Sequence, residues 1–161
     1  FVLSVPDKFD AMQLTTVSAK SVKDMLDDAN MRFDYLVIDG NTDLNNPISS
    51  IGMTEADKLL VVHRPSVKDC FWQQSMQNVN NLLNLSYKTV HILNGYDRSC
   101  DLSAYKSSIG LKFEFEIGYV DNANVYANTG QAIVFHDLKQ EREYISGMKA
   151  LTSSVILGGG Q

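Results

Sequence analysis

The chain has 161 residues, 44% hydrophobic and 20% charged, which is the composition of a globular protein and excludes a disordered one. Its formal net charge of -5, with no Lys/Arg block longer than a pair, argues against a dedicated nucleic-acid surface. Cys70 and Cys100 form no CxxC pair, so neither a disulfide framework nor a zinc site is indicated. No apolar run approaches the roughly 18 residues that span a bilayer, and no signal peptide precedes the first apolar segment. We expect a cytoplasmic protein without a transmembrane segment.

The apolar pattern predicts strands that alternate with helices along the chain. Strands are expected at Phe1–Val5, Phe33–Gly40, Leu59–Val62, Thr89–Asn94, Lys112–Ile117 and Ala132–Phe135. Helices are expected at Thr15–Met31, from Pro47, from the capping residue Ser66 to Leu85, at Ser103–Ile109 and at Gln140–Ile156. This alternation is typical of an α/β fold, a mostly parallel doubly wound sheet with helices on both faces. Because the chain opens on a strand-like segment, we expect residues 1–161 to be the carboxyl-terminal part of a single larger domain, with 158–161 as a flexible tail.

The run Phe33–Gly40 is the most informative segment of the sequence. Its Tyr-Leu-Val-Ile core has no polar face, so it predicts a strand that is covered on both sides. Ligands of open α/β sheets sit outside the carboxyl ends of the strands, and Asp39 stands at such an end. A carboxylate there can hold a magnesium ion beside a phosphate. The alternative is that Asp39 caps the following turn.

Four motifs follow one another over nearly the whole chain: FDYLVIDGNTDL, TEADKLLVVHRPSVKD, VHILNG and EIGYVDNANVYANTGQAIV. Together and in this order they resemble the motifs of the MinD/ParA family of deviant P-loop ATPases. The first two, FDYLVIDGNTDL and TEADKLLVVHRPSVKD, resemble the family's strand ending in Asp-x-Pro-Pro-x-Leu and its Ala-Asp strand with a following Pro. VHILNG is similar to the strand whose terminal Asn reads adenine. EIGYVDNANVYANTGQAIV resembles the Ile-Pro segment that is followed twelve residues later by Gly, an offset kept by Gly118 and Gly130. Within the family, YANTGQAI is most like the pilus-assembly members of the CpaE/TadZ type.

The resemblance implies a P-loop NTPase fold that binds ATP and Mg²⁺ in the intact protein. By resemblance, Asp39 would bind the magnesium shell and Asn94 would hydrogen-bond the adenine edge. The residues beside the base would be Gly118, Tyr119, Val120 and Asp121. The family's switch implies a homodimer around ATP, with protein partners in a larger pilus, secretion or partition machine.

Three departures from the family limit what this chain can do alone. The Gly-Lys-Gly-Gly-x-Gly-Lys-Ser/Thr phosphate loop is absent from these residues, and in the family it lies upstream of every motif seen here. Asn41-Thr42 replaces the Pro-Pro pair, and Gly118 replaces the Pro before the adenine loop. We therefore assign no catalytic residue and expect ATPase activity only if the parent protein carries the loop.

Two alternatives remain open. The first is a degenerate, non-hydrolysing scaffold of the same fold, which Asn41-Thr42 would allow. The second is a bacterial-type tyrosine kinase, although the tail Gly-Gly-Gly-Gln carries no tyrosine cluster.

Three further residues were weighed for a role in a site. His63 and Arg64 follow a strand end, where an arginine can meet a phosphate or a partner subunit. A surface or packing role is the favoured interpretation of both. His91 lies inside a strand and is interpreted as a satisfied core residue rather than as a catalytic base.

Overall fold

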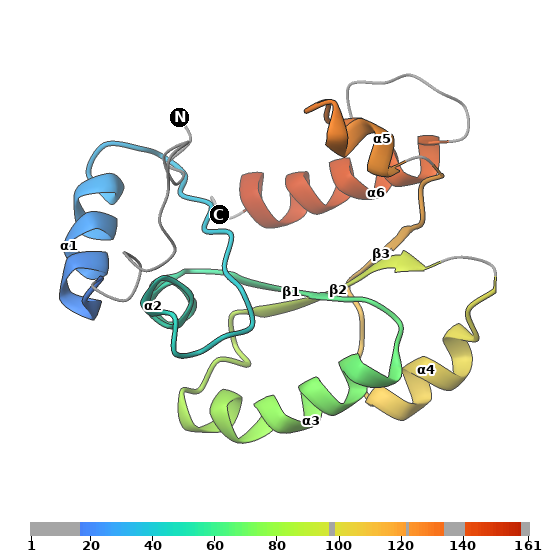
Figure 1. Cartoon of the computed structure of the whole chain (residues 1–161), viewed down its shortest axis with the longest axis horizontal. Helices are drawn as coiled ribbons and strands as arrows, with labels where there is room; N and C mark the ends of the chain where they lie inside the picture. The colour runs from blue at the N-terminus through green and yellow to red at the C-terminus, as the bar shows by residue number, and fades with distance from the viewer. Residues whose placement is uncertain (1–16, 97–98, 122, 134–140, 159–161) are drawn as a thin grey trace. The chain divides into compact units, whose positions relative to one another are not determined.

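The computed structural model describes residues 17–96, 99–121, 123–133 and 141–158 (Figure 1). The chain divides into two compact units, Phe1–Ala56 and Asp57–Gln161, which we describe one at a time. The predicted strand at Phe1–Val5 lies outside the described residues, as does most of the one predicted at Ala132–Phe135.

The first unit contains two helices that pack on each other, α1 (Ala19–Asn30) and α2 (Pro47–Glu55). The Ser18 hydroxyl accepts a hydrogen bond from the Ser21 amide and so caps α1. The Asn46 side chain accepts from the Ile48 amide and caps α2, whose first turn begins at Pro47. The helix entry predicted at Pro47 is confirmed.

The strand predicted at Phe33–Gly40 is wrong for this structure, because these residues adopt no regular secondary structure. A strand needs a neighbour that completes its hydrogen-bond ladder, and within the described residues this segment has none. Its apolar side chains are consequently uncovered, with Tyr35 61% and Val37 85% exposed. Only Ile38 packs inward, where its methyl groups lie 3.1 and 3.2 Å from the position that a Cβ at Gly52 would take.

The second unit is built on three parallel strands in the order β1 (Leu59–His63), β2 (Thr89–Tyr96) and β3 (Phe115–Gly118). Leu59 pairs with Thr89 at the start of the β1–β2 ladder, and Ile92 pairs with Phe115 at the start of the β2–β3 ladder. The connecting helices are α3 (Val67–Leu82) and α4 (Leu102–Ile109). The α/β class with a parallel sheet, predicted from the alternation of apolar segments, is confirmed.

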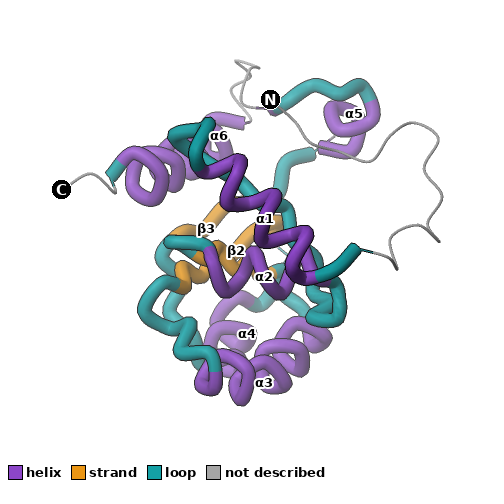
Figure 2. The backbone as a smooth tube through the Cα atoms, turned by 90° about the vertical axis from the view of Figure 1, so that its left-hand side faces the viewer, coloured by secondary structure: helices purple, strands orange, loops and turns teal. Residues whose placement is uncertain are grey.

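Helices cover both faces of this sheet, as Figures 1 and 2 show. On one face, α6 (Arg142–Leu151) and its π-helical continuation η4 (Thr152–Leu157) pack on the sheet. The buried core of that face is formed by Ile92, Ile117 and Leu151. On the other face lie α3 and α4, over a core formed by Leu93, Tyr105 and Phe113. Successive β2 residues therefore serve opposite cores, as the pleat of a strand requires.

Strand β1 is covered less completely than predicted. Its residues alternate in burial, and Leu60 and Val62 are exposed while His63 is fully buried. The reason is geometric, because α6 packs on β3 rather than on β1. Helix α5 (Ala123–Asn128), which was not expected from the sequence, follows β3 and ends shortly before Gly130, whose φ of 68° is left-handed.

Candidate functional site at the carboxyl ends of the strands

A cleft of about 440 Å³ lies in the second unit where the three strands end. It is lined by Arg64, Pro65, Ser66, Gly95, Tyr96, Ser99, Cys100 and Tyr119. Residues from the ends of all three strands thus converge on one hollow, at the edge of the sheet where α/β proteins bind ligands.

The loop Arg64–Ser66 joins β1 to α3 and forms one wall of the cleft. Ser66 ends the loop as the capping residue of α3, because its hydroxyl accepts a hydrogen bond of 3.1 Å from the Asp69 amide. The hydroxyl proton of Ser66 remains available for donation to a ligand. The first amides of α3 and the positive end of its dipole lie at the same place.

A glycine brings Arg64 into the cleft. Gly95 has a φ of 69°, at the point where the β2–β3 register shifts between Asn94 and Tyr96. Such a backbone suits glycine and strains most other residues. The Arg64 Nε lies 3.6 Å from the position that a Cβ at Gly95 would occupy, an ordinary contact distance, so the two residues are neighbours in the wall of the cleft.

Two tyrosines form the rest of the wall. The Tyr119 amide donates a hydrogen bond of 2.7 Å to the Tyr96 carbonyl, which ties the residue after β3 to the end of β2. Tyr119 is 46% exposed, so part of its ring is available to a ligand. Arg64 is also exposed and makes no ion pair or hydrogen bond within the described part of the chain. The cleft therefore offers one unpaired cation and aromatic surface, which suits a ligand that is anionic at one end and planar at the other.

The structure brings some of the sequence-predicted residues to this cleft and not others. Tyr119 lines it, and Gly118 ends the strand next to it. Asn94 is half-buried inside β2 opposite Ile117 and does not line the cleft. Val120 is buried, and Asp121 is exposed one residue later.

Asp39, the residue proposed for magnesium, is exposed in the first unit. Among the residues that the structure describes, no group of three or more His, Cys, Asp or Glu side chains is placed to hold a metal ion. Asp39 would thus supply a single carboxylate, which is how Mg²⁺ is commonly held when phosphates and water complete its shell.

The sequence does not single out Gly95, Tyr96 or Ser99, which line the cleft. At the Asn-Gly dipeptide the family resemblance points to Asn94, whereas Gly95 provides the left-handed turn. The sequence favours a surface or packing role for Arg64, because it does not show in which direction a side chain past a strand end will point.

Below the cleft, four side chains form a buried polar network. His63 is 0% exposed, and its Nδ1 lies 2.9 Å from Asp69 Oδ2 while its Nε2 lies 2.9 Å from His91 Nδ1. The Tyr105 hydroxyl donates to the same Asp69 oxygen. The ring of Phe113 packs edge-on against His63 and stacks on Tyr105, with centroids 5.4 and 6.0 Å away.

The network perturbs two of its members. Burial lowers the pKa of His91 below its ordinary value of 6.5, and the neighbouring His63 lowers it further. Burial, together with the hydrogen bond to Asp69, raises the pKa of Tyr105. Tyr105 is therefore a hydrogen-bond donor at every physiological pH. The interpretation of His91 as a satisfied residue agrees with its hydrogen bond to His63.

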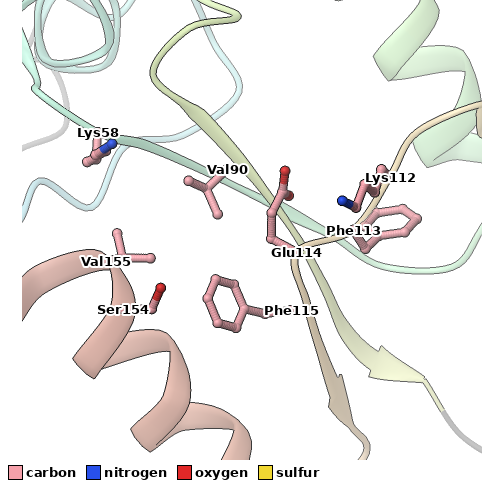
Figure 3. Close-up of a pocket in the computed structure, with 8 residues that line it drawn as sticks. All are labelled: Lys58, Val90, Lys112, Phe113, Glu114, Phe115, Ser154 and Val155. Atoms are coloured by element: carbon pink, nitrogen blue, oxygen red, sulfur yellow. The ribbon is translucent and has the colours of Figure 1, made fainter. Parts of the chain in front are cut away.

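A second hollow, of about 430 Å³, lies at the opposite ends of the strands (Figure 3). It is lined by Lys58, Val90, Lys112, Phe113, Glu114, Phe115, Ser154 and Val155. Figure 3 shows the Phe115 ring beside Ser154 and Val155, with the two lysines at opposite sides. The Glu114 carboxylate accepts a hydrogen bond from the His91 amide and adds a negative charge to this hollow.

The second unit has an α/β fold, a parallel sheet between helix layers with its candidate site at the carboxyl edge. A search of solved structures shows that the chain is similar to the MinD cell division protein of Aquifex aeolicus, with a TM-score of 0.60 and 16% sequence identity. The match covers 84% of this chain and 59% of the MinD chain. At this identity the likeness establishes the fold.

Searches with sequence models of protein families and among curated proteins found no match. Among the described residues, no helix combines the length and apolar character needed to cross a membrane.

Proposed function

We propose that this chain is the carboxyl-terminal portion of a MinD/ParA-like nucleotide-binding domain and that the cleft at the carboxyl ends of its strands holds ATP. The observation that carries this proposal is the convergence of Arg64, the amino terminus of α3 and two tyrosines on one hollow. A nucleotide is anionic at its phosphates and planar at its base, so it matches both kinds of surface.

Each side chain has a role that follows from its chemistry. Arg64 forms charge-assisted hydrogen bonds to a phosphate, and the Ser66 hydroxyl donates a further one. The exposed face of Tyr119 stacks on the base. By the family resemblance alone, Gly118, Val120 and Asp121 would lie beside the base and Asn94, which does not line the cleft, would hydrogen-bond the adenine edge.

By the family resemblance, Asp39 of the first unit would contribute one carboxylate oxygen to the shell of a magnesium ion in the intact protein, where the ion would neutralise phosphate charge. The phosphate loop that would complete the site is not part of these 161 residues.

The wider function that we propose is a switch. ATP would be sandwiched between two copies of the intact domain, and its binding and release would order and release the loop after Asp39. Such a dimer would position a larger assembly, such as a pilus, secretion or partition machine. A scaffold that binds without hydrolysis is the second candidate, favoured by Asn41-Thr42 in place of the family's Pro-Pro pair.

Calorimetric titration with ATP tests the proposed site. Arg64→Ala should weaken binding about tenfold or more, because a charge-assisted hydrogen bond contributes roughly 1.5 to 3 kcal/mol. Tyr119→Ala should weaken it about fivefold or more, because stacking on an aromatic ring contributes roughly 1 to 3 kcal/mol per base.

Matched controls are Arg142→Ala on α6 and Tyr87→Ala in the loop before β2, both exposed and both outside the cleft. If all four variants bind ATP as the unchanged chain does, the cleft is not the nucleotide site. Phosphate release measured on a longer protein that carries the upstream loop then separates the switch, which turns over, from the scaffold, which only binds.

A further inference from the structure

The buried network of Tyr105, Asp69, His63 and His91 has no part in the function proposed above, since none of the four lines the cleft. Its position nevertheless ties it to the cleft. His63 immediately precedes Arg64, and Asp69 lies three residues after Ser66 in the first turn of α3. The 2.9 Å contact between His63 Nδ1 and Asp69 Oδ2 therefore joins the residues on either side of the Arg64–Ser66 loop.

The contact between the two histidines limits how many protons the network can hold. His63 Nε2 and His91 Nδ1 face each other at 2.9 Å, a distance that accommodates one hydrogen between them. With Asp69 accepting from His63 Nδ1–H, the pair keeps its geometry when it is neutral and when it carries one positive charge. When both rings are protonated, two N–H groups point at each other and the contact must open.

We propose that the His63–His91 pair, anchored by Asp69 and Tyr105, is a pH-operated latch that positions the Arg64–Ser66 loop, so that anion binding in the cleft weakens when both rings are protonated. The latch itself rests on the geometry of the network. Its effect on a ligand rests on the function proposed above.

The groups that face His91 fix the direction of the pH dependence. They are His63 on β1, Asp69 on α3 and Glu114 just before β3. Tyr105 is faced by Asp69, Cys70 and Cys100. Although both carboxylates favour protonation of His91, burial and the charge of His63 outweigh them, and the pKa of His91 lies below 6.5 in the folded chain.

In the unfolded chain His91 takes up its proton near pH 6.5, its ordinary value. Below that pH the unfolded state binds more protons than the folded state, so the free energy of unfolding falls as the pH decreases from 6.5 toward the folded pKa. Above pH 6.5 His91 contributes no pH dependence.

Nuclear magnetic resonance of the full chain tests the latch without any ligand. The ring signals of both histidines and the amide signals of Arg64 and Ser66 are followed from pH 8 to 5. We expect the two amides to shift with the same midpoint as the second histidine protonation. Amides that stay constant while both rings titrate would overturn the latch.

Calorimetry with ATP at the same pH values tests the consequence for binding. Below the midpoint, the affinity of the unchanged chain should fall by up to about tenfold per pH unit relative to that of His91→Gln, whose side chain does not titrate. Titration of the phosphate itself is common to both proteins and cancels in this comparison. His136→Gln, which removes the remaining histidine of the sequence, should keep the profile of the unchanged chain.

A second variant keeps the test decisive if His91→Gln does not fold. Tyr105→Phe removes the hydroxyl that donates to Asp69, which leaves the carboxylate freer to favour protonation of His91. The midpoint of His91 should therefore move to higher pH, whereas a Tyr105 that acts only through packing would leave it unchanged. ATP binding without a latch response would reject the latch alone, and a latch response without ATP binding would reject the proposed function alone.

Discussion

At the scale of single residues, the carboxyl-end cleft depends on Gly95. Its left-handed backbone lies at the register shift at the end of β2, whereas a Cβ there would make only an ordinary contact of 3.6 Å with Arg64 Nε. Gly118, at the end of β3, lacks the left-handed backbone, since its φ is not positive, and a Cβ there would make an ordinary 4.0 Å contact with Tyr96. The two glycines lie at the ends of neighbouring strands, but only the backbone conformation at Gly95 requires a glycine.

We expect Gly95→Ala to lower the free energy of unfolding by about 1 to 2 kcal/mol, the cost of a left-handed L-residue. Gly118→Ala is the matched control and should change it by less than about 0.5 kcal/mol. Urea unfolding followed by circular dichroism measures both. Equal effects of the two substitutions would contradict the role assigned to the Gly95 backbone.

At the scale of elements, the sequence predicts a helix start most directly, through its capping residue. Ser66 was expected as a cap and a helix was expected to begin at Pro47; the side chains of Ser66 and Asn46 accept hydrogen bonds from amides that those helix starts leave without partners. Helix α3 ends at Leu82 rather than at Leu85, because Asn84 turns left-handed with a φ of 50°. The sequence does not predict how α6 packs on the sheet, because the contact between Gly147 of α6 and Ile117 of β3 is seen only in the tertiary structure.

Gly147 is the residue through which α6 faces Ile117 of β3. A small and a large substitution at this position distinguish the effect of helix propensity from the effect of packing. A Cβ at this position would lie 3.4 Å from Ile117 Cγ1, an ordinary contact, so Gly147→Ala should stabilise the protein by up to about 1 kcal/mol. Gly147→Leu should instead destabilise it by about 1 to 3 kcal/mol, because the larger side chain meets β3.

The control for this pair is Ser146→Leu, one residue earlier on the exposed side of α6, which should stay within about 0.5 kcal/mol. Thermal unfolding ranks the three variants. A Gly147→Leu protein as stable as Ser146→Leu would mean that α6 does not pack on β3 through this residue.

At the scale of the whole molecule, regular pairing is concentrated in the second unit. Strand β2 is hydrogen-bonded on both sides and buries Ile92 toward α6 and Leu93 toward α4. The segment Phe33–Gly40 has comparable apolar character but no ladder within the described residues. Apolar content alone therefore does not distinguish a paired strand from an unpaired segment.

Hydrogen exchange read by mass spectrometry should show this difference directly. Amides of Thr89–Tyr96 should exchange orders of magnitude more slowly than those of Asp34–Gly40, because exchange from a doubly paired strand requires global opening. Peptides from α3 provide an internal reference, because they report the exchange rate of amides protected by a single helix. Equal protection of the two segments would show that Phe33–Gly40 is a paired strand in solution.

The sequence by itself determined the α/β class, the alternation of strands and helices from β1 to β3 and the cap Ser66, because apolar periodicity and capping act over a few neighbouring residues. Helix α5 was not expected from the sequence. Only the tertiary structure decided that Phe33–Gly40 pairs with no strand among the described residues, that Arg64 enters the cleft and that His63 meets His91. Each of these depends on a partner that is distant along the chain, such as the 28 residues that separate the two histidines. Such partners are brought together by the packing of the strands and helices, which the local pattern does not encode.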